Sequence, residues 1–170
     1  MISTKNNYDV MGAFGNVTIK EYNNNVLVQE KTIHNNVTVE GITNILDCMC
    51  LNRSPVITGI RIMYIDSNGA NFKDFDTFSS RRVVQGNVPY LELKFYLSSD
   101  ELNGTTLTGA KLLTQDGASN TIIFAEVDIT SKFADTTDEN VIETIYKTVE
   151  RSVIYIWRIG ITSEFLKSIS

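Results

Sequence analysis

His34 is the only histidine in the chain, so it is the first residue to consider for acid–base chemistry near neutral pH. As a general base it would need an oriented nucleophile, and no serine, cysteine or carboxylate motif supplies one. The chain contains no G-x-S-x-G, P-loop or H-E-x-x-H sequence. Because His34 ends an alternating stretch beside two asparagines, we expect a hydrogen-bonded structural residue. The sequence therefore predicts a non-enzymatic protein with no catalytic residue.

Cys48 and Cys50 are the only cysteines, and they lie two positions apart. On a helix such residues point about 200° away from each other, so this pair should not form a disulfide. A metal site would need further Cys or His ligands, and His34 is the only one that the chain offers. We expect two buried thiols in a reduced protein that holds no metal and no cofactor.

Two acidic segments resemble cation sites only in composition. Residues 66–76 alternate Asp and Asn, but Gly69 stands at the fourth position, where an EF-hand loop needs glycine at the sixth. No glutamate closes that loop either. Residues 135–139 contain three carboxylates without the spacing of a ligand set. Both segments are interpreted as acidic surface turns.

Three phenylalanines, Phe72, Phe75 and Phe78, recur at three-residue spacing in a stretch, residues 67–80, that otherwise resembles a polar loop. Such aromatic residues either cap an open end of a fold or contact another subunit. The sequence leaves both alternatives open. These residues are the candidate subunit interface.

The elements that position these residues follow from hydrophobic periodicity. Residues 14–22 and 26–34 alternate, which predicts an antiparallel hairpin around a three-residue asparagine loop. In its second strand we expect Val26, Val28 and Ile33 to lie in the core. Beyond this hairpin the period changes from that of a strand to that of a helix.

Residues 38–51 carry apolar side chains at three- and four-residue steps, which predicts one amphipathic helix. Thr38 is the expected N-cap. The stripe that should face the core consists of Val39, Ile42, Leu46 and either Met49 or Cys50.

Further strands are predicted at residues 56–66, 83–97, 107–114, 121–130 and 141–162, separated mostly by Gly, Asn and Asp turns. The last stretch is either one long strand or two strands that meet near Glu150. This pattern predicts a mainly β protein, an antiparallel β-sandwich with one helix. With 170 residues, we expect one sandwich domain, residues 14–170, after a flexible N-terminal arm, residues 1–13.

Composition limits the class of partner. Hydrophobic residues make up 42% and charged residues 21%, which is ordinary for a globular domain. A net charge of −5 disfavours nucleic acid, since Arg81-Arg82 is the only adjacent basic pair. Residues 1–9 are polar and no apolar run reaches the length of a membrane span. We therefore expect a protein made in the cytoplasm, with no signal peptide and no membrane partner.

The segment from Thr32 to Leu46 resembles an element of small structural proteins from tailed bacteriophages, which runs approximately T-x-H-N-L-V-T-x-x-G-L-N-x-L in that group. The matching residues are Thr32, His34, Asn35, Val37, Thr38, Gly41, Ile42 and Leu46, with Asn36 in place of the leucine. Residues 107–113, 122–135 and 152–162 resemble later strands of the same family in the same order. Residues 57–66 depart from it by lacking the glycine pair of the family's strand.

The resemblance implies a structural subunit of a bacteriophage tail or tail-like particle, as a tail, neck or baseplate component. Its partners would be other virion proteins and copies of itself, and it would be located in the virion after assembly in the bacterial host cytoplasm. The alternative is a receptor- or carbohydrate-binding fibre module that contacts a host surface glycan, or a capsid decoration protein.

Overall fold

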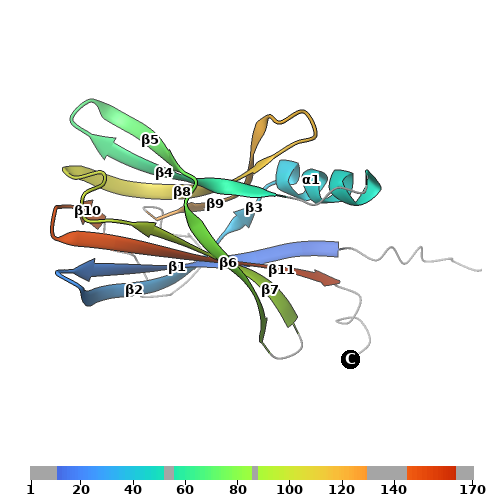
Figure 1. Cartoon of the computed structure of the whole chain (residues 1–170), viewed down its shortest axis with the longest axis horizontal. Helices are drawn as coiled ribbons and strands as arrows, with labels where there is room; N and C mark the ends of the chain where they lie inside the picture. The colour runs from blue at the N-terminus through green and yellow to red at the C-terminus, as the bar shows by residue number, and fades with distance from the viewer. Residues whose placement is uncertain (1–10, 52–55, 86–87, 130–144, 164–170) are drawn as a thin grey trace, which may run out of the picture.

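The computed structural model describes residues 11–51, 56–85, 88–129 and 145–163 (Figure 1). Within them the elements are β1 (Met11–Asn23), β2 (Val26–His34), β3 (Asn36–Val37), α1 (Val39–Cys50), β4 (Ile57–Asp66), β5 (Gly69–Phe75), β6 (Phe78–Gln85), β7 (Val88–Leu97), β8 (Thr105–Gln115), β9 (Thr121–Asp128), β10 (Ile145–Lys147) and β11 (Arg151–Ser163).

Two antiparallel sheets pack together, which confirms the predicted β-sandwich with one helix (Figure 1). Sheet A has the strand order β2-β1-β11-β7-β6. Sheet B has the order β3-β9-β8-β4-β5, and β10 pairs with β8. The chain therefore crosses between the sheets several times, and neighbouring strands in space are often distant in sequence.

The centre of sheet A is the pairing of β1 with β11, which extends from Met11 opposite Ser163 to Asn23 opposite Arg151. β11 supplies the largest core side chains, because Tyr155 and Trp157 are both fully buried. The pairing includes residues 11–13, so the end of the expected arm belongs to β1, where the ladder with β11 holds it. Residues 1–10 lie outside the described part of the chain.

The β1–β2 hairpin is confirmed, with a turn one residue shorter than expected. Asn24 and Asn25 form the turn with φ of 47° and 66°, the positive values that tight hairpin turns require. The expectation that Val26 and Val28 enter the core is wrong, since both are exposed. β2 is an edge strand with a register shift near its start, and Lys31, not a valine, lies opposite the buried Ile19.

The helix begins where predicted, because the Thr38 Oγ1 accepts a hydrogen bond from the Gly41 N–H at 2.9 Å. Thr38 also donates through Oγ1 to the Ile123 carbonyl at 2.5 Å and joins α1 to β9. The predicted core-facing stripe is wrong for Val39, Leu46 and Cys50, which are exposed, whereas Ile42 is half-buried. The residues that α1 buries are Gly41, Asn44 and Cys48, and Ile45 is half-buried against the core.

This reversal has a physical cause in the residues that contact the sandwich. The Cα of Gly41 lies against the Phe124 backbone, where a side chain would collide with the carbonyl. The Asn44 amide donates to the Gln115 carbonyl at 2.9 Å, so a polar residue is satisfied at the buried face. α1 thus docks through Gly41, Asn44 and Cys48 together with Ile45, and the apolar side chains of Val39 and Leu46 face outward.

Two further stretches differ from the simplest interpretation of the sequence. Residues 67–80 are not a loop, since most of them form β5 and the start of β6. β5 is an edge strand in which all residues between Gly69 and Phe75 are exposed. Its side chains therefore do not alternate between buried and exposed positions, and the sequence does not show the pattern of a half-buried strand. At the C-terminus the two-strand alternative is confirmed, because β10 belongs to sheet B and β11 to sheet A.

Candidate assembly surfaces

The three candidate phenylalanines divide into two groups. Phe75 ends β5 of sheet B and Phe78 begins β6 of sheet A, where the chain crosses between the sheets. Both are half-buried against the core, and the ring of Phe78 lies 5.1 Å from that of Phe95. Their contacts therefore favour the capping alternative for these two residues.

Phe72 is different, because 51% of it is exposed. It lies opposite Met63 on β4, on the face of sheet B that points away from the core. The Arg61 guanidinium sits 4.2 Å from the centre of its ring and forms two hydrogen bonds with Asp74, at 2.7 and 2.9 Å. Phe72 is thus the one of the three phenylalanines that is accessible to a partner, and the Arg61 guanidinium orients its ring.

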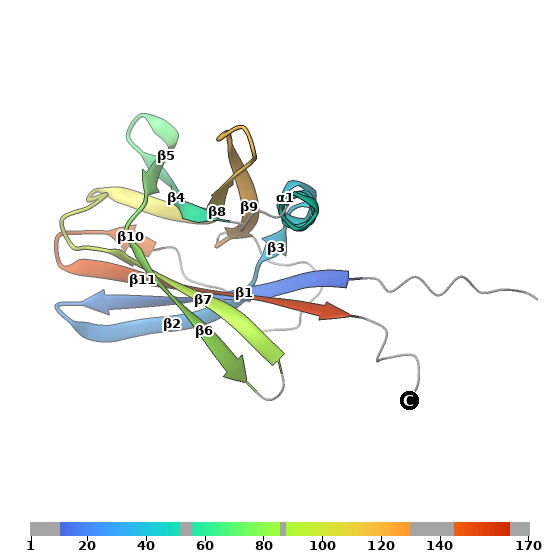
Figure 2. The same cartoon turned by 45° about the vertical axis from the view of Figure 1, so that its right-hand side comes forward.

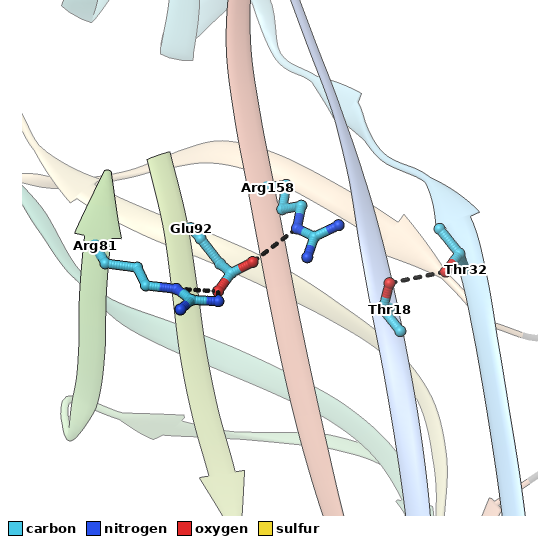
Figure 3. Close-up of polar contacts among 5 residues, drawn as sticks. All are labelled: Thr18, Thr32, Arg81, Glu92 and Arg158. Atoms are coloured by element: carbon cyan, nitrogen blue, oxygen red, sulfur yellow. Dashed lines mark hydrogen bonds and ion pairs between the residues drawn. The ribbon is translucent and has the colours of Figure 1, made fainter. Parts of the chain in front are cut away.

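A row of polar side chains crosses the face of sheet A that points away from the core (Figure 3). Glu92 on β7 lies between two arginines, with Arg81 Nε donating at 2.6 Å and Arg158 Nε donating at 2.7 Å. Burial alone would raise the pKa of Glu92, but the hydrogen bonds and charges of Arg158 and Arg81 outweigh burial and lower it. The carboxylate is therefore held ionised between two cations.

The same row continues across β11 and β1 to His34 on β2, since Asn16 pairs with both Arg158 and His34. Thr18 on β1 and Thr32 on β2 form a hydrogen bond between their hydroxyl groups, with 2.8 Å between the two Oγ1 atoms (Figure 3). The sequence did not indicate this row, because its members come from five strands. The regular alternation of charged and apolar residues in β7 is the signal that points to it.

His34 is exposed at the end of β2 and lines a groove of about 840 Å³ with Asn35 and Asn36. Lys111, Glu126 and Asp128 contribute charges to the same groove. Among the described residues that line it there is no Phe, Tyr or Trp, and both polar atoms of the Asn35 amide are buried without a partner. The expected hydrogen-bonded role of His34 stays a prediction.

The two cysteines differ in environment: Cys48 is buried, as expected, whereas the expectation for Cys50 is wrong because it is exposed on α1. In the part of the chain that the structure describes, no three His, Cys, Asp or Glu side chains are grouped as metal ligands are. Asp74 of the first acidic segment pairs with Arg61. The second acidic segment, residues 135–139, lies outside the described residues.

One buried cation is structural. Lys147 on β10 is fully buried, and its Nζ donates to the carbonyls of Arg151 and Thr148 at the β10–β11 turn. Burial lowers the pKa of Lys147, although the charges of Glu101 and Asp100 oppose the shift. These contacts hold the chain where it crosses from sheet B to sheet A.

Exposed apolar side chains gather on α1 and on strands at the sheet edges. Val39 and Leu46 lie on α1, and Val84 lies on edge strand β6. Edge strand β2 carries Val26, Leu27 and Val28. Among the described residues, no helix has the length and apolar character needed to cross a bilayer. The exposure of these apolar side chains makes their positions candidate contacts for other proteins.

Fold and surface together define a β-sandwich whose one described helix exposes the apolar side chains of Val39 and Leu46. No known protein family, curated protein or solved structure matches the chain.

Proposed function

We propose that this protein is a non-enzymatic structural subunit of a bacteriophage tail or tail-like particle, as a tail, neck or baseplate component. The observation that carries the proposal is the apolar stripe of α1, where 81% of Val39 and 50% of Leu46 are exposed on a helix that is already anchored through its other side. Exposed apolar stripes of this kind mark protein contacts. The sequence resemblance, which runs in order from Val17 to Thr162, supplies the class of particle.

In this role the sandwich is the rigid body and its surfaces provide complementarity to neighbours. Its partners are copies of itself and other virion proteins, and its location is the virion after assembly in the bacterial cytoplasm. The net charge of −5 makes nucleic acid a poor partner. The role needs no cofactor, because contact surfaces and not chemistry perform it.

Light scattering after size-exclusion chromatography tests the proposal over a series of protein concentrations. We expect a defined oligomer that grows in population with concentration. A protein that remains monomeric at every concentration, and that is encoded without tail, portal or baseplate genes beside it, would contradict the assignment.

A second candidate is a binding module for a receptor or a carbohydrate. The groove beside His34 favours it, because the unpartnered amide of Asn35 is a polar group that a ligand would satisfy. None of the described lining residues is a Phe, Tyr or Trp that could stack against a sugar ring. A glycan array that returned one specific sugar, and an Asn35→Ala variant that lost it, would place this candidate first.

A further inference from the structure

α1 has two apolar sides. Ile45 packs against the core and lines a cleft at one end of the sandwich. Leu46 lies about 100° further round the helix and, with Val39 and Cys50, forms an exposed row, interrupted by Thr43, that we call the α1 stripe. The α1 stripe cannot enter the cleft of its own subunit, because the side of α1 that carries Ile45 faces this cleft and the stripe lies on a different side of the helix.

The surroundings of the α1 stripe are acidic. Glu40 and Asp47 flank it, and together with Asp116 they line a groove of about 320 Å³ between α1 and the β8–β9 turn. α1 itself contains no lysine or arginine. Two α1 stripes packed face to face would bring like charges together, which disfavours a symmetric helix-to-helix contact.

The cleft offers the opposite charge and the same apolar character. It lies between α1 and the β6–β7 hairpin, has a volume of about 430 Å³, and is lined by Ile45, Ile57, Arg82, Pro89, Tyr90, Leu91, Phe124 and Ile159. Among the described residues that line the cleft, Arg82 is the only charged one. Val84, 60% exposed, extends the apolar surface along β6 beyond the cleft.

The positions of the two surfaces suit a contact between separate copies. In Figure 2, α1 and the β6–β7 hairpin lie on opposite sides of the same end of the molecule, and the hairpin diverges from sheet B. β6 is an edge strand that pairs only with β7 among the described strands. A neighbouring copy can therefore approach the hairpin without displacing any described element.

We propose that the α1 stripe of one copy occupies the cleft beside the β6–β7 hairpin of a second copy, with the acidic side chains of α1 facing Arg82. This inference rests on the proposed function and specifies the surface through which subunits join. Because the two surfaces differ, the contact is heterologous, and repeated copies form a closed ring or a helical tube.

Charge reversal tests the contact. Arg82→Glu and Asp47→Arg should each weaken self-association about tenfold or more, and the Asp47→Arg/Arg82→Glu double variant should recover most of the loss. Leu46→Gln should weaken it similarly by removing the apolar knob. Glu150→Arg and Val149→Gln are matched controls, since both residues are exposed at the β10–β11 turn and should leave self-association unchanged.

Cross-linking supplies a second measurement that does not depend on affinity. Cys50 is exposed on the α1 stripe, so a Val84→Cys variant places a second thiol on the opposite surface. A short bis-maleimide linker should convert this variant into a ladder of covalent multimers, whereas the unmodified protein and a Val149→Cys control should not form one. Thermal melting of each variant confirms that the fold is retained.

The outcomes separate the two proposals. If the wild-type protein assembles but the Leu46 and Arg82 variants assemble equally well, the α1 stripe is not the contact and the proposed function stands. If the wild-type protein is monomeric at every concentration and the Val84→Cys variant gives no cross-linked ladder, both the contact and self-assembly are refuted.

Discussion

Gly41→Ala is the sharpest test of how α1 is held, because helix propensity and tertiary packing predict opposite signs. In an isolated helix the change is favourable by about 1 kcal/mol. Here a Cβ at position 41 would lie 2.9 Å from the Phe124 Cα and 3.0 Å from its carbonyl carbon, and closer still to the carbonyl oxygen. These are backbone atoms of β9, so no side chain can rotate to make room.

The magnitude follows from what must move. Overpacking of this kind costs about 1–3 kcal/mol. A shift of α1 away from β9 also weakens the Thr38 contacts, in which its N–H donates to the Phe124 carbonyl at 3.0 Å and its Oγ1 to that of Ile123. That loss adds about 1 kcal/mol. After the propensity gain is subtracted, we expect a net destabilisation of about 1–3 kcal/mol.

Urea unfolding and thermal melting measure this change, and each kcal/mol should lower the melting temperature by about 2–4 °C in a chain of this length. Thr43→Ala is the matched control on the exposed side of α1 and should change stability by less than about 0.5 kcal/mol. A rise in the melting temperature of Gly41→Ala would refute the close approach of α1 to β9. The outward direction of the α1 stripe would then lose its basis.

Three further changes test other parts of the structure. Glu92→Gln should lower the free energy of unfolding by about 1–2 kcal/mol at neutral pH. Because folding lowers the pKa of Glu92, this stability difference from wild type should be complete above the ordinary pKa of about 4.3. It should shrink as the pH falls through the lowered pKa of the folded protein, which urea unfolding at a series of acidic pH values measures. Lys147→Met removes a group whose pKa is lowered by burial, so in urea unfolding the stability of wild type relative to the variant should increase as pH rises from the lowered pKa towards about 10.4; a pH-independent difference would contradict this. Asn25→Ala should cost about 1 kcal/mol, because Asn25 has a φ of 66°, whereas Asn25→Gly should be close to neutral in thermal melting.

Local patterns were sufficient for the elements whose burial alternates. The β1–β2 hairpin was predicted because apolar alternation and turn residues coincide there. The helix was predicted together with its Thr38 cap, since both depend on residues within one turn of each other. β5 was missed because an edge strand that is exposed on nearly every residue has no alternation to detect.

The candidate surfaces needed more than the sequence. The Phe72, Phe75 and Phe78 spacing was visible, but only the chain crossing between sheets B and A separates the exposed Phe72 from the half-buried Phe75 and Phe78. The carboxylate between two arginines was not predictable, because Glu92 and Arg158 are 66 positions apart and meet only through the β7–β11 pairing.

The amino-acid sequence by itself determined a single β-rich fold with one amphipathic helix, because strand and helix periods are local properties of the chain. It also predicted the apolar stripe of Val39, Ile42, Leu46 and either Met49 or Cys50. Only the tertiary structure decided which side of that helix faces the core. A glycine that lets the backbones approach, and an asparagine amide that satisfies a β8 carbonyl, outweigh the apolar stripe as the docking side. Val39, Leu46 and Cys50 of that stripe therefore remain exposed, and they form the surface that we propose another subunit binds.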